Sequence, residues 1–193
     1  MVLVLTSGPS VEPISLTEAK AFLRVDDTNE DTLISSLITA SRIHVEVSLG
    51  QGLITQNWSY LIDAWPSERD IFLPIKPVQS ISEIVTYDNS DVATIYAASN
   101  YTVDKVSDMP RVVLKHGAAA PVPIKHINGI EVKMVVGYGA AADTVPEPIR
   151  QALKLLVTHW FENREPVMFG NNALHVPNIV EGLLGPYTRA RLA

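Results

Sequence analysis

The sequence predicts an α+β fold, in which helical segments from the two ends of the chain form a core and an antiparallel β region is inserted between them. Apolar residues recur at helical spacing before residue 50 and again after residue 146. Between about residues 56 and 136, short runs of β-branched and aromatic residues are separated by Pro, Asn, Asp and Gly, as in strands joined by turns. Helices and strands that segregate along the chain are typical of α+β proteins.

Two helices are expected near the N-terminal end. Ser15 and Glu18 form a capping-box pattern, in which each side chain satisfies a free backbone N–H, so a short helix is expected from Leu16 to about Arg24. A second helix is indicated by an apolar stripe that is closed by Gly50. The stripe consists of Leu33, Ile34, Leu37, Ile38, Val45 and Leu49. Burying it contributes on the order of ten kcal/mol, so packing rather than helix propensity is expected to hold this helix.

The central stretch is expected to contain strands. The polar turn from Asp88 to Asp91 indicates a hairpin, and Gly117 to Pro123 is expected to be a loop. Pro74 and Pro77 lack the N–H that a sheet ladder needs, so their segment is expected to be a sheet edge or an extended connection. The candidate strands are Asn57 to Ile62, Ile81 to Tyr87, Thr94 to Tyr96, Tyr101 to Val103, Arg111 to Lys115 and Gly129 to Val136.

Two more helices are expected near the C-terminal end. Pro146 and Pro148 suit the first turn of a helix, where a missing N–H leaves no bond unmade, and Pro166 is expected to end this helix. Its apolar stripe consists of Ile149, Leu153, Leu156, Val157, Trp160 and Phe161. A short helix is expected from about Pro177 to Gly185, with Ile179, Val180, Leu183 and Leu184 as its apolar residues.

The length of the chain fits one domain with a sizeable apolar interior. We therefore expect a single domain over residues 1–193. Its parts are N-terminal helices at 1–52, a β insertion at 53–140, C-terminal helices at 141–186 and a tail at 187–193.

The composition argues against several functional classes. The net charge is −6 and no basic stripe is present, whereas general nucleic-acid binders neutralise phosphates with Lys and Arg. The chain contains no cysteine, which excludes disulfides, thiol nucleophiles and thiolate metal sites. No apolar run approaches membrane-spanning length, and the apolar segment that begins at Met1 is too short for a secretion signal.

Two motifs have the outline of a binding site but fail its requirements. Gly137 and Gly139 follow an apolar strand as in a dinucleotide-binding loop, yet the next helix begins only near Pro146 and no second βαβ unit follows. His159 and Glu162 share a helical face as a metal-binding pair does, but the other histidines show no ligand spacing with them. We therefore expect neither a cofactor nor a metal.

Catalysis also has little support in the sequence. Asp26, Asp27, Glu30 and Asp31 lack the glycine and the terminal glutamate of a calcium loop, and they are expected to favour the positive N-terminus of the second helix. No Gly-x-Ser-x-Gly, His-Glu-x-x-His or P-loop lysine motif is present. We expect no catalytic residues and no enzyme activity.

Five groups of residues resemble the head–tail connector, or adaptor, proteins of long-tailed phages, prophages and gene transfer agents. The resemblance covers nearly the whole chain and rests on the order and spacing of the groups. They are Glu12 to Ala19, Leu53 to Trp58, Leu73 to Val78, Val136 to Gly139, and His159 to Glu165.

The resemblance implies a structural virion protein rather than an enzyme. It would form a ring, expected to be dodecameric, beneath the portal and would link the DNA-filled head to the tail. The implied partners are the portal protein, neighbouring copies of the chain, and stopper or other neck and tail proteins. Genomic DNA would pass through the lumen without sequence-specific binding, and no membrane is involved. The implied location is the virion neck, assembled in the bacterial host cytoplasm.

The resemblance also implies a site. In this family the C-terminal segment reaches the portal, and the matching segment here is about Val176 to Ala193. A short tail with an aromatic anchor and cations can order against a preformed groove, whereas the alternative is a frayed terminus. The predicted portal-contact residues are Tyr187, Arg189, Arg191 and Leu192.

Two alternative functions are left open. One is another ring component of the neck, such as a stopper or a tail terminator. Proteins of that kind are usually poorer in helix, so the helical segments at both ends of this chain favour the adaptor. The other is an enzyme or ligand-binding α+β domain, which predicts a concave site with convergent polar groups between the sheet and the C-terminal helix.

Overall fold

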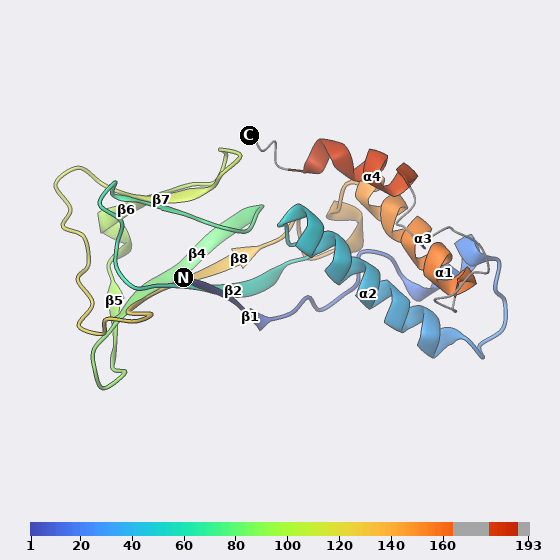
Figure 1. Ribbon diagram of the computed structural model, residues 1–193, viewed down its shortest axis with the longest axis horizontal. Coiled ribbons are helices and arrows are strands. Elements are labelled where there is room, and N and C mark those ends of the chain that lie inside the picture. Colours follow the sequence, from blue (N-terminus) through green and yellow to red (C-terminus); the bar gives the residue numbers. More distant parts are fainter. Residues whose placement is uncertain (164–177, 189–193) are drawn as a thin grey trace, which may run out of the picture. The chain divides into compact units, whose positions relative to one another are not determined.

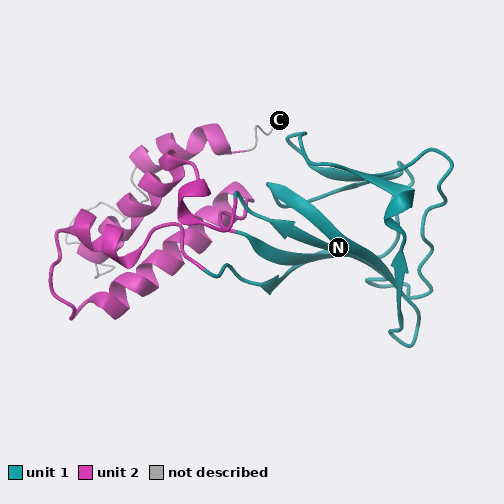
Figure 2. Cartoon of the chain, turned by 180° about the vertical axis from the view of Figure 1, so that it is seen from behind, with its two compact units in different colours: residues 1–10, 55–138 teal, residues 11–54, 139–193 magenta. Residues whose placement is uncertain are grey.

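A computed structural model describes residues 1–163 and 178–188, and the chain divides into two compact units (Figure 1 and Figure 2). Unit 1 comprises Met1–Ser10 and Thr55–Tyr138, and unit 2 comprises Val11–Ile54 and Gly139–Ala193. Among the described residues, unit 1 holds the named strands and unit 2 holds the α-helices. Helices from both ends of the chain thus enclose a β insertion in the sequence, which confirms the predicted α+β class.

Unit 1 is built on a five-stranded antiparallel sheet with the order β1-β2-β8-β4-β5. β8 lies at its centre because it pairs with β2 on one side and with β4 on the other. The strands are β1 (Val2–Ser7), β2 (Gln56–Ile62), β4 (Val78–Tyr87), β5 (Ala93–Tyr96) and β8 (Ile130–Val136). β1, which the sequence analysis did not assign, pairs with β2 and forms one edge.

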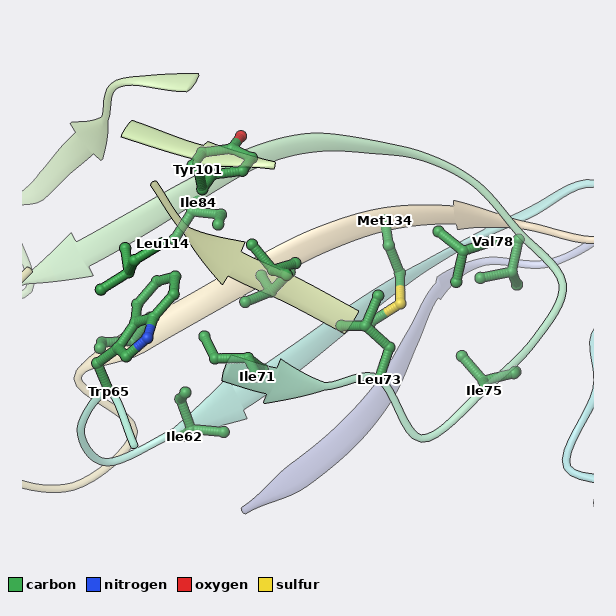
Figure 3. Packing of buried hydrophobic residues seen from close by; sticks show 14 residues of the cluster. Ile62, Trp65, Ile71, Leu73, Ile75, Val78, Ile84, Tyr101, Leu114 and Met134 are labelled. Atoms are coloured by element: carbon green, nitrogen blue, oxygen red, sulfur yellow. The ribbon is translucent and has the colours of Figure 1, made fainter. Parts of the chain in front are cut away.

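A second sheet of three antiparallel strands has the order β3-β7-β6. Its strands are β3 (Asp70–Phe72), β6 (Tyr101–Asp104) and β7 (Arg111–Leu114), and β3 was likewise not assigned from the sequence. The core of unit 1 joins both sheets: Ile71 and Leu114 from the small sheet belong to one buried cluster with Ile84 and Met134 from the large sheet (Figure 3). Residues alternate across a strand, so the large sheet keeps its other face outside this core.

The predicted connections in unit 1 are confirmed. β4 and β5 form an antiparallel hairpin around the Asp88 to Asp91 turn, in which the Asp88 carboxylate accepts hydrogen bonds from the backbone N–H groups of Ser90 (2.8 Å) and Val92 (2.9 Å). The segment with Pro74 and Pro77 connects β3 to β4 outside the named strands, with bends at Pro74 and Ile75, and its Lys76–Pro77 peptide bond is cis. Residues 117–123 form a loop without helix or strand.

Unit 2 contains four α-helices within the described residues: α1 (Leu16–Leu23), α2 (Asp31–Leu49), α3 (Glu147–Glu162) and α4 (Asn178–Leu184). α3 packs against α1, α2 and α4, and Figure 1 shows it between α2 and α4. The predicted stripe of α2 buries Ile34, Ile38, Val45 and Leu49, while Leu33 and Leu37 are half-buried. Short 3₁₀ turns lie at Ala98–Asn100, Ala142–Thr144 and Gly185–Tyr187.

The ends of α1 and α2 follow the predicted capping chemistry. The Glu18 backbone N–H donates to Ser15 Oγ at 3.1 Å, and the Ser15 N–H donates to Glu18 Oε2 at 2.8 Å, which completes the capping box. α2 ends at Gly50, whose φ of 64° lies in the left-handed region that favours glycine.

The predictions for the C-terminal helices also agree with the structure where it describes them. Pro146 caps α3 and Pro148 lies in its first turn. Ile149, Leu153, Leu156 and Val157 of the predicted stripe are buried, and Trp160 and Phe161 at its end are half-buried. Pro166 and Pro177 lie outside the described residues, and α4 begins at residue 178.

Replacing Leu153 by Ala tests the helical core. Leu153 is fully buried in α3, so the substitution should lower the free energy of unfolding by about 2–5 kcal/mol, measured by urea denaturation followed by helical circular dichroism. Val47→Ala is the matched control, because Val47 lies in α2 but is 77% exposed and should change stability by less than about 0.5 kcal/mol. Equal effects of the two substitutions would contradict the assigned core.

Candidate assembly interface

The last described residues are held firmly against the end of α2. α4 packs on α3 and buries Val180 and Leu184. In the 3₁₀ turn that follows, the Tyr187 carbonyl accepts a 2.7 Å hydrogen bond from Nε2 of Gln51, which is 3% exposed. The Thr188 hydroxyl donates to the Gly185 carbonyl at 2.7 Å and closes the turn. Residues 178–188 are therefore held in place within unit 2.

Of the four predicted portal-contact residues, only Tyr187 falls within the described part of the chain. Its side chain is half-buried. Arg189, Arg191 and Leu192 lie outside the described residues, so their role stays a prediction.

A buried arginine joins three segments of unit 2. Arg42 of α2 is 7% exposed, and its guanidinium contacts Glu12 through Nε and Glu46 through Nη1, each at 2.8 Å. Burial opposes the charge, but the hydrogen bonds and charges of Glu12 and Glu46 outweigh it and raise the pKa of Arg42. Glu46 also accepts a 2.9 Å hydrogen bond from the Leu53 backbone N–H. The charges of Arg42, Glu12 and Glu46 are therefore paired with one another and hold segments of unit 2 together.

A second cation ties α3 to the start of α1. Arg150 Nε donates to the Pro13 carbonyl at 3.1 Å, Nη1 contacts Glu147 at 2.8 Å, and Nη2 contacts Glu18. The Ser15 backbone N–H contributes most to lowering the pKa of Glu18. Burial opposes this effect, and the Ser15 hydroxyl and the charge of Arg150 lower the pKa further. The capping box is thus also part of the contact between the two ends of the sequence.

Unit 2 also contains an open pocket of about 580 Å³. Its apolar lining includes the buried side chains of Ile14 and Ile38. The polar groups are few, and the Glu12 carboxylate is engaged by Arg42 and by a 3.0 Å hydrogen bond from Thr39 Oγ1. The remaining lining comprises Val11, Ser15, Leu16, Ser35, Ala140, Ala141 and Ala142. The pocket therefore suits an apolar group rather than a reacting substrate.

The two glycines after β8 are explained by backbone conformation and close packing, without a bound nucleotide. In unit 1, Gly137 has a φ of 122°, and its carbonyl accepts a 2.9 Å hydrogen bond from Gln79 Nε2. In unit 2, a Cβ on Gly139 would lie 2.6 Å from the Thr144 side chain, so this position needs glycine for close packing. Because both glycines face protein atoms of their own unit, they do not form a phosphate-binding loop.

His159 and Glu162, the pair that resembles metal ligands, lie in the last turn of α3. The His159 carbonyl accepts hydrogen bonds from the backbone N–H of Asn163 at 3.1 Å and from its side chain at 2.8 Å. Trp160 meets the His44 ring of α2 edge-on, with 5.8 Å between the ring centres. Over residues 1–163 and 178–188, no group of three or more His, Cys, Asp or Glu side chains is arranged to hold a metal ion.

Two of the acidic residues at the start of α2 have local partners. Lys20 Nζ lies 2.6 Å from Asp31 Oδ1 and 2.6 Å from the Asp27 carbonyl. Asp27 Oδ1 in turn accepts a 2.9 Å hydrogen bond from the Asn29 N–H. Asp31 is the first residue of α2, where a negative charge favours the helix dipole, as the sequence suggested.

The outer face of the large sheet carries a similar balance of charge. Lys133 of β8 contacts Glu83 of β4 at 2.6 Å, and this hydrogen bond raises the pKa of Lys133. Glu131 accepts hydrogen bonds from Ser59 and Tyr87, and the bond to Glu131 raises the pKa of Tyr87. The cation on this face is thus paired, which leaves no basic track for a phosphate backbone here.

The fold and these contacts define the class of protein. It is an α+β protein with a helical unit and an inserted β unit, and ion pairs between its charged side chains stabilise the helical unit. The chain belongs to the head completion protein family, whose model matches residues 12–178. This confirms the resemblance to head–tail connector proteins that the sequence showed.

The fold is shared with chains in solved structures of gene transfer agent (GTA) particles. One comes from the "Neck of empty GTA particle computed with C6 symmetry" (TM-score 0.84), and another from the "Virion of native gene transfer agent (GTA) particle" (TM-score 0.82). A third comes from the "Neck of native GTA particle computed with C12 symmetry" (TM-score 0.78). Each is 23% identical to this chain, and each match covers 100% of this chain and 98% of the other.

No curated protein matches the chain. In the part of the chain that the structure describes, no helix combines the length and the apolar character needed to cross a membrane.

Glu18→Gln should destabilise the protein in a pH-dependent manner. The folded state lowers the pKa of Glu18. Its carboxylate therefore stabilises the fold at pH values above its ordinary pKa of 4.5, and this contribution is lost as the pH falls through the lowered pKa of the folded state. Because the side chain is 38% exposed, solvent screening limits the expected loss at pH 7 to about 0.5–1 kcal/mol. Urea denaturation at pH 7 and pH 3 measures the difference between variant and wild type.

Glu162→Gln is the control, because Glu162 is exposed at the last position of α3. It should leave stability unchanged at both pH values. A Glu18→Gln effect of the same size at pH 3 as at pH 7 would show that the charge of Glu18 plays no part.

Proposed function

We propose that this protein is a structural subunit of a virion neck, and specifically the adaptor that forms a ring beneath the portal and links the DNA-filled head to the tail. The observation that carries the proposal is the match of the whole chain to chains of GTA particles, two of them described as necks, together with its membership of the head completion family. The proposed location is therefore the virion neck.

A ring is supported by the symmetry of the similar structures. Two of the necks were computed with C6 and C12 symmetry, which requires identical copies around an axis. Rings of more than two identical copies are built from heterologous contacts, in which two different surfaces of each copy meet. The proposed ring of this protein is dodecameric and contacts the portal on one side and stopper or other tail-side neck proteins on the other.

The charge of the chain suits a conduit for DNA. The sequence has 21 acidic and 15 basic residues, and several of the basic ones, among them Lys20, Arg42 and Arg150, are engaged in ion pairs. A lumen with a net negative charge would attract the phosphate backbone only weakly, so the duplex could slide through it. Genomic DNA is thus proposed as a passing partner without sequence-specific binding.

A structural role also agrees with the chemistry of unit 2. Its pocket is lined mainly by apolar groups, and its Glu12 carboxylate is occupied by Arg42. The hydroxyls of Ser15 and Thr39 donate to the Glu18 and Glu12 carboxylates, and these carboxylates are also held by Arg150 and Arg42. An enzymatic or ligand-binding α+β domain is therefore a weaker alternative.

The portal contact is proposed for the C-terminal tail, at Tyr187, Arg189, Arg191 and Leu192. The fixed turn supports this role, because the hydrogen bond between Gln51 and the Tyr187 carbonyl holds the residues that immediately precede residues 189–193. A tail with a rigid origin and an aromatic residue at its base loses less entropy on docking than a wholly free segment.

A truncation after Thr188 tests the portal contact. It removes residues 189–193 but keeps the hydrogen bond between Gln51 and Tyr187, so unit 2 should remain folded. We expect co-sedimentation with the cognate portal ring to weaken by at least about tenfold, because two cations and an apolar side chain are lost. The double variant Arg189→Glu/Arg191→Glu should weaken binding in the same direction.

Lys115→Glu is the charge-matched control, because Lys115 is exposed in unit 1, and it should bind like the wild type. Undiminished binding of the truncated chain would contradict the tail contact. If the full-length chain binds a preformed adaptor ring but not the portal itself, the protein is a stopper. If it binds tail tubes instead, it is a tail terminator.

A further inference from the structure

Unit 1 displays a cluster of exposed aliphatic side chains on the long connection between β7 and β8, which Figure 1 shows as a segment without helix or strand. Val122 is 86% exposed, Ile124 is 62% exposed and Ile127 is 70% exposed. We call residues 121–127 the aliphatic loop. Three large aliphatic side chains so close together are costly to leave in water, and such patches mark interaction sites.

The aliphatic loop is held in place at both ends. Before it, the Ala119 carbonyl accepts a 2.6 Å hydrogen bond from Tyr96 Oη, and the Ala118 carbonyl accepts one of 3.0 Å from Arg69. Within it, the Lys125 N–H donates to the Tyr87 carbonyl at 3.1 Å, and Lys125 Nζ contacts Asp91 at 2.5 Å.

Two further features limit the freedom of this loop. Pro121 and Pro123 fix their own φ angles on either side of Val122. A Cβ on Gly129 would lie 2.7 Å from the Pro123 side chain, so the loop folds back tightly on its own end. The aliphatic side chains are thus displayed on a preorganised segment, which lowers the entropy cost of binding.

The pocket of unit 2 has the complementary chemistry. Its volume of about 580 Å³ lies in the range of sites that hold a small organic ligand, so more than one aliphatic side chain fits. Ile14 and Ile38 provide a buried apolar floor, and Val11 and three alanines add apolar lining. Its carboxylate is already neutralised by Arg42, so an apolar group meets no unpaired charge there.

We propose that the aliphatic loop of one copy inserts into the unit 2 pocket of a second copy, and that this contact joins neighbouring subunits of the ring. The inference rests on the proposed neck function, because a ring requires two different, mutually complementary surfaces on each chain. An exposed aliphatic projection and an open apolar pocket on separate units of the same chain meet that requirement. Burial of the loop side chains then provides the driving force for association.

Mixed cross-linking of single-cysteine variants tests the contact directly, since the chain has no native cysteine. His126→Cys places a thiol on the exposed side of the aliphatic loop and keeps Val122, Ile124 and Ile127. Ser35→Cys places a thiol at the pocket with little change in shape. We expect a short bis-maleimide to give covalent dimers from an equimolar mixture of the two variants, and few from either variant alone.

The mixture separates a contact between copies from one within a copy, because neither chain carries both thiols. Val106→Cys mixed with Ser35→Cys is the matched control: Val106 is 98% exposed in another loop of unit 1 and should not cross-link. Equal dimer yields from the control mixture, or no dimers from the His126 and Ser35 mixture, would overturn the proposal.

A second measurement links the contact to assembly. Ile124→Asp should weaken self-association of the full chain by at least about tenfold in analytical ultracentrifugation, whereas Val106→Asp should not. Both side chains are largely exposed, so neither substitution should unfold the protein. Normal association and ring formation of Ile124→Asp would overturn the inference but leave the neck function intact. Cross-linking in a chain that binds no portal or neck partner would overturn the neck function instead.

Discussion

The structure depends on the pairing of the two chain segments that lead into and out of the β insertion. β2 and β8 are neighbours, and their pairing reaches Gln56 and Val136 at the ends of the two strands. In unit 1, the Gln79 side chain donates to Thr55 Oγ1 at 2.8 Å and to the Gly137 carbonyl at 2.9 Å. In unit 2, Ile54 and Gly139 form a parallel bridge. Because the ends of the insertion are held together, unit 2 does not bear the full entropy cost of closing a long flexible loop.

In the helical unit, a buried arginine lies close to the segment that leads into the β insertion. Arg42 connects Glu12, which precedes α1, with Glu46, which also binds the Leu53 N–H just before the chain enters unit 1. Removing one partner of a buried ion pair leaves an uncompensated charge and typically costs about 3–5 kcal/mol. The network therefore favours one arrangement of α2 and its flanking segments, and a subunit that must present the same surfaces in every copy needs such a unique arrangement.

The sequence predicted the parts of the fold that local chemistry determines. The capping box, the glycine that ends α2 and the prolines that begin α3 are short-range signals, and the structure contains all three. β1 was not assigned because its residues Val2 to Leu5 are all apolar, so apolar and polar residues do not alternate in it. β3 has only three residues, which is too short for a period. The central place of β8 depends on long-range pairing, which no local pattern encodes.

The candidate sites also divide into those that short sequence motifs suggest and those that arise only from tertiary packing. The metal-like and nucleotide-like motifs were set aside from spacing alone, because such a site needs further groups at fixed positions. The pocket and the network around Arg42 were not foreseen, since Glu12, Arg42 and Ala141 meet only through tertiary packing. The exposure of the aliphatic loop was not foreseen either. Val122 lies in the segment expected to be a loop, but local sequence does not show whether Val122, Ile124 and Ile127 are buried by distant residues.

A contact made by a few aliphatic side chains also bears on when a ring forms. Stable interfaces usually bury about 1,200–2,000 Å², which is more than one short loop can supply, so the proposed contact alone holds two copies weakly. Binding of several tails to one portal would raise the effective concentration of each loop near the next pocket. The weak heterologous contact would then close into a ring on the portal, while free chains at low concentration avoid open filaments. Because the single contact is weak, such a subunit would form a ring only where a portal gathers several copies.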